Sequence, residues 1–348
     1  MEDSGREKIK ITVNDHRVIY AQSGVSLLQA LKKENIFVPS ACGGRGMCGL
    51  CRVRVPEGAP AEFTPAELMR LNTEEQKNNI RLACQVKLHR AGGTVERDLR
   101  ISIPESFFNA RQYTAIVSEL NDLTHDIREI RLQLQSPQTI SFKSGQYVQF
   151  RIPPYAGHQR IVYRAYSIAS PPLENASVEL EVARVSRGIG TTYIFEHLKK
   201  GDTIIFNGPH GDFYLRDSDK PAIMIAGGSG MAPMKSMLAD MLGRKIKRET
   251  RYFFGARAPS DVFHAGLMRS FERELPNFKF VPAVIKIPPG EKWDGEIGLI
   301  PNVAARRIAD GFAGEVYLCG SPAMIEACLK ILRQKKVSED NVFYDKFA

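Results

Sequence analysis

The sequence has no long hydrophobic run, because no segment approaches the ~20 consecutive apolar residues that a membrane-spanning helix needs. Its first residues, MEDSGREKIKIT, are charged and contain no hydrophobic signal-peptide core. We therefore expect a cytoplasmic protein without an integral membrane segment. In that compartment its six cysteines indicate metal ligands and free thiols rather than disulfides.

The chain also lacks a concentration of charge of one sign. Its net charge of +9 is scattered, and the densest basic run is RKIKR at residues 244–248. Basic and aromatic residues do not interleave as they do on nucleic-acid-binding surfaces. We expect no nucleic-acid partner. An acidic protein is the more plausible partner for a chain of this charge. No hydrolytic triad or general acid–base pair stands out, and 348 residues predict two or three domains.

Four of the cysteines form the most informative pattern. Cys42, Cys48 and Cys51 stand in the run ACGGRGMCGLC, and Cys84 follows much later. Three closely spaced thiols with a fourth downstream hold a [2Fe–2S] cluster, whose two irons need four thiolates. The loop also contains glycines that let a backbone wrap closely around such a cluster, namely Gly43, Gly44, Gly46 and Gly49.

A zinc site is the alternative for the same four thiols. Structural zinc sites with four cysteine ligands usually pair two C-x2-C knuckles, and this sequence has one, at Cys48 and Cys51. No Cys-x-His pair lies nearby, which argues against a Rieske centre. The spacing favours the iron–sulfur site and leaves zinc open.

The residues around the cysteines predict a small mixed fold. KIKITVNDHRVIYA alternates like a hairpin that turns at Asn14-Asp15. Residues 26–36 have apolar positions at helical spacing, with Ser26 as the N-cap and Gln29 three positions on, as in a capping box. CRVRVPEG predicts another strand.

The texture of the sequence changes twice further on. From Tyr113, short segments such as IREIRLQLQ and GQYVQFRI alternate with Gly and Pro, which predicts an antiparallel β-barrel. From about Asp219, strands alternate with helices, which predicts a doubly wound parallel sheet. We expect a multidomain α+β and α/β chain with domains at residues 1–105, 106–218 and 219–348. IPESFFNARQ would link the first two, and residues 103–111 would act as a hinge.

Two motifs in the middle segment indicate a flavin nucleotide. RAYS, residues 164–167, follows a predicted strand, and SRGIGTTYIFEHL opens a helix about twenty residues later. A helix start with adjacent glycines binds pyrophosphate through its free N–H groups. Arg164 would neutralise the phosphates, Tyr166 would stack on the isoalloxazine and Ser167 would hydrogen-bond near N5. The candidate flavin-binding residues are Arg164, Ala165, Tyr166, Ser167, Gly188, Gly190, Thr191 and Thr192.

A nicotinamide site is predicted in the last segment. AIMIAGGSGMAPM is a buried strand, a glycine-rich turn and a helix, and Gly228 and Gly230 let a dinucleotide approach the backbone. CGSP, which begins at Cys319, ends a later apolar strand. Met231, Met234, Met237 and Met241 are at helical spacing and predict core packing. The candidate nicotinamide-site residues are Gly228, Gly230, Met231, Ala232, Pro233, Arg257, Asp261, Cys319 and Gly320.

In this order RAYS, the G-x-G-T-T helix start, GPHGDF, AGGSGMAP and CGSP resemble the ferredoxin–NADP+ reductase superfamily over residues 110–348. With the cysteine motif, the whole chain resembles flavin-dependent NADH:acceptor reductases with an N-terminal β-grasp ferredoxin domain. These include the F subunit of the Na+-translocating NADH:quinone reductase and the reductase components of oxygenases. The gap of five residues between Cys42 and Cys48 favours the F-subunit branch, whereas the missing membrane anchor departs from it.

The resemblance implies the cofactors FAD, NADH and a [2Fe–2S] cluster, with Ser167 and Cys319 as candidate catalytic residues. It places the Cys319 thiol beside the nicotinamide C4, Met231 at the turn near the ligand, and Phe347 over the other flavin face. A small buried hydrophobe is the alternative for Cys319, and we expect that role for Cys328. After the second strand of the parallel sheet only Arg257 is basic and Asp261 follows, which favours NADH over NADPH.

These sites predict an oxidoreductase that passes electrons from NADH through FAD to the cluster, and on to an acceptor protein or a small acceptor of quinone type. The first alternative is the same chemistry in an oxygenase. The second is a non-enzymatic, zinc-stabilised binding module.

Overall fold

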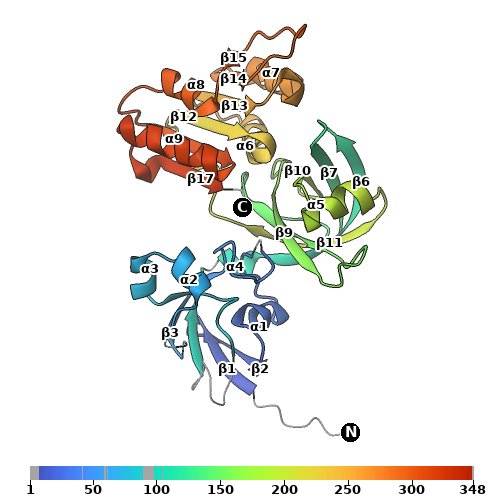
Figure 1. Cartoon of the computed structure of the whole chain (residues 1–348), viewed down its shortest axis with the longest axis vertical. Coiled ribbons are helices and arrows are strands. Elements are labelled where there is room, and N and C mark those ends of the chain that lie inside the picture. Colours follow the sequence, from blue (N-terminus) through green and yellow to red (C-terminus); the bar gives the residue numbers. More distant parts are fainter. Residues whose placement is uncertain are drawn as a thin grey trace. The chain divides into compact units, whose positions relative to one another are not determined.

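The computed structural model describes residues 8–40, 42–58, 60, 62–88, 98–104 and 106–346 (Figure 1). The chain divides into two compact units. The first comprises Met1–Tyr113, Val148–Ala165 and Ile205–His210; the second comprises Thr114–Tyr147, Tyr166–Ile204 and Gly211–Ala348. This division separates the strands of the middle segment, so the three domain boundaries expected from the sequence stay a prediction.

The N-terminal part of the first unit is built on a five-stranded mixed sheet in the order β2-β1-β5-β3-β4. Its strands are β1 (Lys8–Val13), β2 (Arg17–Gln22), β3 (Arg52–Glu57), β4 (Ile80–Leu82) and β5 (Leu99–Ser102). The predicted β1–β2 hairpin is confirmed, and Asn14 and Asp15 turn it at φ values of 50° and 60°. β5 runs parallel to β1, which completes the mixed sheet of a β-grasp fold.

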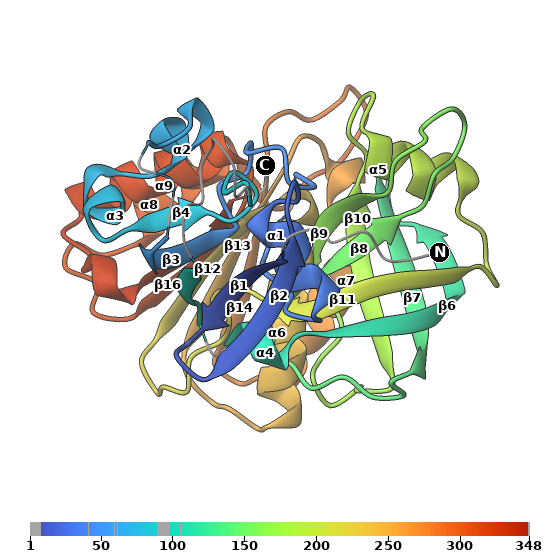
Figure 2. The ribbon, with the colours of Figure 1, turned by 90° about the horizontal axis from the view of Figure 1, so that it is seen from below.

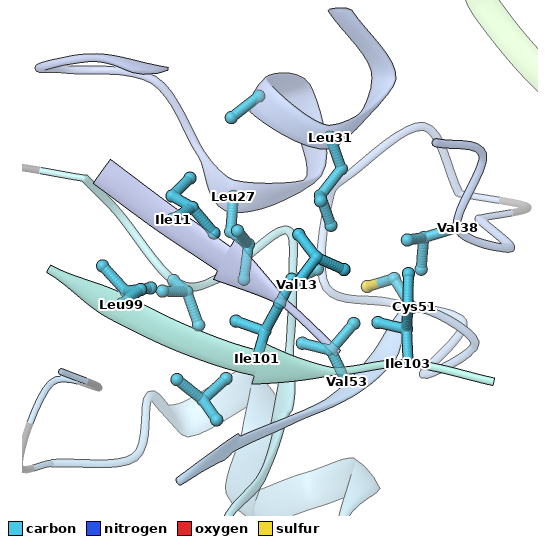
Figure 3. Packing of buried hydrophobic residues seen from close by; sticks show 14 of the residues in the cluster. Ile11, Val13, Leu27, Leu31, Val38, Cys51, Val53, Leu99, Ile101 and Ile103 are labelled. Atoms are coloured by element: carbon cyan, nitrogen blue, oxygen red, sulfur yellow. The ribbon is translucent and has the colours of Figure 1, made fainter. Parts of the chain in front are cut away.

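Helix α1 (Leu27–Lys33) packs on this sheet. The predicted capping box is confirmed, because the Ser26 side chain accepts from the Gln29 backbone while Gln29 reaches back to the Ser26 N–H. Leu27 and Leu31 of α1 point toward Ile11 and Val13 of β1 (Figure 3). Two short helices, α2 (Pro65–Arg70) and α3 (Thr73–Lys77), lie between β3 and β4 in the chain.

The segment expected to be a hinge is folded. It contains helix α4 (Ser106–Asn109), and Phe107 and Phe108 pack against the core of the five-stranded sheet. The two aromatic side chains explain the difference, because an exposed hinge would leave them in water. Within this segment, residues 106–111 are therefore not a free linker.

The middle sheet has six strands in the order β10-β7-β6-β11-β8-β9. They are β6 (Arg111–Asp122), β7 (Ile127–Ser136), β8 (Tyr147–Ile152), β9 (Val162–Ser167), β10 (Ser177–Ala183) and β11 (Thr203–His210). β7 pairs antiparallel with both β6 and β10, and Figure 2 shows β6 and β7 side by side. The short helix α5 (Ile189–Thr192) continues as a π-helical turn, Tyr193–His197.

The second unit contains a six-stranded parallel sheet in the order β15-β14-β13-β12-β16-β17. Its strands are β12 (Ala222–Gly227), β13 (Thr250–Ala256), β14 (Phe278–Val284), β15 (Glu296–Ile297), β16 (Glu315–Gly320) and β17 (Val342–Lys346). One face packs on α6 (Met231–Gly243) and α7 (Ala265–Glu274), and the other on α8 (Ile300–Arg307) and α9 (Pro322–Gln334). The doubly wound fold predicted for this segment is confirmed.

Candidate redox and cofactor sites

The four predicted cluster ligands lie together in two pairs. Cys42, Cys51 and Cys84 are buried and Cys48 is half-buried. In the first pair, the Cys48 thiol donates to Cys42 at an Sγ–Sγ distance of 3.4 Å, which lowers the pKa of Cys42 to about 4 and raises that of Cys48. In the second, the hydrogen bond between Cys51 and Cys84 lowers the pKa of Cys84 to about 7 and raises that of Cys51. Each pair thus stabilises one thiolate, the form that binds iron.

The pairing distinguishes between the two metals considered. Within the described part of the chain, which includes all four thiols, no three of these Sγ atoms lie within 4.8 Å of one another. One tetrahedral zinc ion would bring every pair of sulfur atoms to roughly 3.8 Å, given Zn–S bonds of about 2.3 Å. Two separated pairs fit a two-iron cluster, in which each iron takes two thiolates.

The cysteine loop needs its glycines because it passes directly over α2. Gly46 and Gly49 have φ values of 75° and 69°. A Cβ on Gly46 would lie 2.8 Å from the Ala66 Cβ, and one on Gly49 would lie 3.3 Å from the Arg70 Cβ. The backbone can therefore wrap tightly only where there is no side chain.

A buried ion pair that sequence reasoning missed supports the position of Cys84, the predicted fourth ligand. Arg81 Nε and Nη2 donate to Glu67 Oε1 and Oε2 at 2.9 and 3.0 Å, and both side chains are almost fully buried. Glu67 Oε1 also accepts from the Leu82 N–H at 3.0 Å, two residues before Cys84. The pair ties α2 to β4 and so fixes the chain that leads to Cys84. Two charges fourteen positions apart give no sequence signal of such a contact.

The flavin motif occupies the end of β9. Ser167 is buried, and its Oγ is without a hydrogen-bond partner among the described residues. Because a buried hydroxyl is nearly always hydrogen-bonded, this atom fits a polar group of a bound ligand. Arg164 is half-buried and its Nη1 donates to the Tyr163 carbonyl at 2.8 Å, while Ala165 and Tyr166 are also half-buried on the strand.

The second flavin motif forms the predicted helix start. Helix α5 begins directly after Gly188, where a Cβ would lie 2.7 Å from Thr191 Oγ1. That hydroxyl donates to the Val185 and Gly188 carbonyls at 3.1 and 3.2 Å. Thr191 therefore holds the loop in place, and the backbone N–H groups of the first turn, including those at Gly190, are the groups suited to a phosphate.

The predicted nicotinamide residues meet at the carboxyl ends of β12 and β16. These neighbouring strands are parallel, and Ala226 lies opposite Cys319. After β12 the chain turns through Gly228–Gly230 into α6, where Met231, Ala232 and Pro233 are buried. A Cβ on Gly230 would collide with the Cys319 carbonyl, whereas the space beside Gly228, at a φ of 57°, is open. Strands on either side of this point run in opposite sequence order, which makes it the switch point where open α/β sheets bind nucleotides.

Cys319 and Met231 form an apolar side of this switch point. Cys319 is fully buried, and burial raises the pKa of its thiol well above the ordinary value, so the group stays protonated and is unsuited to nucleophilic attack. Met231 Sδ accepts from the Tyr252 hydroxyl at 3.3 Å. The expectation that Met234, Met237 and Met241 fill the core is confirmed, since all are buried together with Met231.

Arg257 and Asp261 follow β13, and both have partners from the β6–β7 connection. Arg257 Nη1 lies 3.4 Å from Asp126 Oδ2, and Asp261 Oδ1 lies 3.5 Å from His125 Nδ1. Asp261 Oδ2 also accepts from the Ala258 N–H at 3.2 Å. Sequence reasoning missed His125 and Asp126 because they are far away in the chain. Phe347, the predicted flavin cover, lies outside the described residues.

Family models match three consecutive segments. They are the 2Fe-2S iron-sulfur cluster binding domain over residues 11–89, the oxidoreductase FAD-binding domain over residues 114–214 and the oxidoreductase NAD-binding domain over residues 224–330. The F subunit of the Na(+)-translocating NADH-quinone reductase of Methylococcus capsulatus is 32% identical over 381 residues, which cover 98% of this chain and 91% of that protein. The F subunit of Neisseria gonorrhoeae is also 32% identical, over 98% of this chain and 92% of its own. This chain belongs to the family of these F subunits.

The solved structures that resemble this member of the family include reductases of oxygenases. A cytochrome P450 reductase of Amycolatopsis superposes with a TM-score of 0.78 at 28% identity and covers 97% of this chain and 98% of its own. The ferredoxin reductase in carbazole 1,9a-dioxygenase superposes with a TM-score of 0.73 at 24% identity, over 98% and 99% of the two chains, and supports the fold alone.

Membership of the family establishes the chemistry at a general level. The chain is an iron–sulfur flavoprotein oxidoreductase with binding domains for FAD, a nicotinamide nucleotide and a [2Fe–2S] cluster. These findings, together with the two thiol pairs, argue against the alternative of a non-enzymatic, zinc-stabilised binding module. No helix in the part of the chain that the structure describes is long and apolar enough for a membrane crossing.

Proposed function

We propose that this protein transfers electrons from NADH through FAD to its [2Fe–2S] cluster, and on to a separate acceptor that is a protein or a small molecule of quinone type. The observation that carries the proposal is the presence of two thiol pairs in one chain with flavin and nicotinamide domains. Bound FAD supplies the step between a two-electron donor and a one-electron carrier. The protein's own part is to position the groups and keep water out.

Arg164 and the α5 start would bind the pyrophosphate, and Ser167 and Tyr166 would orient the ring. The Ser167 hydroxyl, unpartnered among the described residues, supports this assignment, as does the need for glycine at position 188. A pyrophosphate-binding helix start also favours FAD over FMN. Arg164→Ala should release the flavin on dialysis and leave the cluster in place. Retention of the flavin, or extraction of FMN, would count against the assignment.

The turn at Gly228 and Gly230, together with Cys319, would hold the nicotinamide ring. The protonated Cys319 thiol offers an apolar contact that shapes the approach of the ring, and Phe347 would cover the flavin face opposite Tyr166. Cys319→Ala should lower kcat with NADH and ferricyanide more than it raises KM. A change confined to KM would show that the thiol contributes only to binding.

NADH is the proposed donor because the ribose end of the site offers little free positive charge. Arg257 is already paired with Asp126, and the Asp261 carboxylate lies near it in the chain. A 2′-phosphate would meet both carboxylates, whereas a ribose hydroxyl can donate to one. Steady-state kinetics should give a higher kcat/KM for NADH than for NADPH. Asp261→Asn should reduce the ratio between these two kcat/KM values. A preference for NADPH in the unmodified protein would refute this choice.

The exit of electrons through the cluster is tested by removing one ligand. Cys84→Ser should abolish or strongly alter the reduced-cluster EPR signal and lower the rate of cytochrome c reduction. Reduction of ferricyanide, which needs only the flavin, should persist. Equal reduction of both acceptors by the variant would show that the cluster is not the exit.

Service to an oxygenase is the second candidate function. The whole-length likeness to a cytochrome P450 reductase favours it specifically. Both candidates use the same internal path and differ in the acceptor. Stable co-purification with an oxygenase component would favour the second, and NADH-dependent reduction of a quinone would favour the first.

A further inference from the structure

The cysteine loop and helix α2 present an exposed apolar surface. Met47 and Leu50 belong to the loop and are 55% and 38% exposed, while Leu68 and Met69 of α2 are 56% and 80% exposed. We call Met47, Leu50 and Met69 the loop–helix face, because Leu68 lies on the side of α2 opposite Ala66 and Arg70, which contact the loop. Exposed apolar side chains that cluster in this way usually mark an interaction site.

The side chains of this face belong to two elements that are packed together. The loop passes against α2 at Gly46 and Ala66, and again at Gly49 and Arg70. Cys48 lies between Met47 and Leu50 in the chain and is half-buried, whereas the other three cluster ligands are buried. The loop–helix face is therefore where the cluster site comes nearest to solvent.

The exposed charge on these two elements has one sign. Arg45 of the loop and Arg70 of α2 are exposed, and the one carboxylate on either element, Glu67, is buried against Arg81. The exposed carboxylates nearest to α2 in the chain are Glu62, three residues before it, and Glu74 of α3, whereas Glu75 of α3 is paired with Arg52 at 2.7 Å. The face thus combines an apolar centre with two guanidinium groups.

We propose that the loop–helix face docks the electron-acceptor protein, and that the acceptor presents an apolar patch flanked by carboxylates. This rests on the proposed function, in which electrons leave from the cluster. Complementary charge steers such a partner to the face, and the apolar contacts lengthen the life of the encounter. The methionines suit a transient contact, because their flexible side chains adapt to more than one surface.

The test uses the full-length holoprotein with NADH and two haem-protein probes, acidic cytochrome b5 and basic cytochrome c. Arg70→Glu should lower kcat/KM for cytochrome b5 about tenfold at low ionic strength and raise it for cytochrome c. Met69→Ser should lower kcat/KM for both probes. Arg45 is left unchanged because its Nε donates to the Cys42 carbonyl at 3.0 Å, so its replacement would disturb the cluster loop.

Two controls separate docking from other effects. Tyr20→Ser removes an aromatic residue of similar exposure, 58% on β2, and should leave both probes unaffected. Cluster reduction by NADH without a probe should keep its rate in Arg70→Glu and Met69→Ser. Unchanged kcat/KM for cytochrome b5 in both variants would overturn the proposal. Slower cluster reduction without a probe would also overturn it, by assigning the face to the chain's own flavin. The proposed function fails separately, if Cys84→Ser reduces the cytochromes at the native rate.

Discussion

Glu67 and Arg81 show how single residues prepare the cluster site. In addition to their mutual ion pair, Glu67 accepts a hydrogen bond from the Leu82 N–H, and Arg81 donates one to the Pro60 carbonyl at 2.7 Å. A buried ion pair of this kind costs desolvation energy and regains it only when every polar atom is satisfied. Its contribution is therefore to fix one arrangement of α2 and β4.

Replacing one partner should expose that cost. Glu67→Gln leaves the Arg81 charge buried without its carboxylate, which should lower the free energy of unfolding by about 3–5 kcal/mol. The measurement is the urea concentration at which the cluster absorbance disappears. Arg100→Gln is the matched control, since Arg100 is 54% exposed in its pair with Glu57 and should cost about 1 kcal/mol or less. Equal midpoints for the two variants would contradict this role.

Asp345 is a single residue whose titration should make stability depend on pH. Burial raises the pKa of its carboxyl to about 6, on β17 opposite Cys319. A raised pKa means that the protonated form is favoured in the fold, so stability is present below the unfolded value of about 3.9 and is lost as the pH rises toward 6. Above that range the protein carries a half-buried, ionised carboxylate.

Asp345→Asn removes this charge and should stabilise the protein at about pH 8 by about 1–2 kcal/mol. The gain should shrink as the pH falls toward about 5, where the native carboxyl is largely protonated. Thermal unfolding, monitored through flavin release at both pH values, measures this gain in stability. A gain that is the same at the two values would mean that the carboxylate is not the cause.

Helix α6 is tied to the antiparallel strands through Lys235. Lys235 Nζ lies 3.5 Å from Glu129 of β7 and 3.4 Å from Glu181 of β10, and also contacts Glu179 of β10. His264, which precedes α7, adds a contact of 3.0 Å to Glu181. Because α6 begins at the nicotinamide turn, this cluster sets the distance of that turn from β10.

Lys235→Met should therefore leave two buried carboxylates, Glu179 and Glu181, and the half-buried Glu129 without the lysine cation. We expect a loss of about 3–5 kcal/mol in unfolding free energy near pH 8. The loss should be smaller near pH 5.5, because burial already raises the pKa of Glu179 and the uncompensated carboxylates would bind protons. Urea denaturation at both pH values measures it. Lys279→Met is the control, because the Lys279 side chain is exposed in its pair with Glu272, and it should change the unfolding free energy little. An equally small effect of Lys235→Met would contradict the account.

Elements are predictable from the sequence to the extent that their signals are local. The β1–β2 turn at Asn14-Asp15, the Ser26 capping box and the helix start after Gly188 depend on a few adjacent residues. Contacts between distant residues are not predictable in this way, and the Phe107 and Phe108 packing, the Glu67–Arg81 pair and the Asp126–Arg257 pair are of this kind. When a side chain is buried by a distant part of the chain, the residues adjacent to it in the sequence do not indicate that burial.

Across the chain, sequence motifs alone indicate three cofactors. Each motif works through backbone geometry that only certain residues permit, such as the glycine turn at Gly228–Gly230 or the loop at Gly46. The structure adds what spacing leaves open. It separates the thiols into two pairs, and it shows that the Ser167 hydroxyl is buried and unpartnered among the described residues.

The central claim is that electrons reach the cluster only through the flavin. The most direct measurement mixes NADH anaerobically with the native protein and with Arg164→Ala, and follows the reduced [2Fe–2S] signal by freeze-quench EPR. In the native protein the signal should appear after the flavin absorbance has bleached. In the variant, depleted of flavin but with its cluster intact, the signal should be absent on the same timescale. Cluster reduction at the native rate in the flavin-depleted variant, or no reduction in the native protein, would contradict the account.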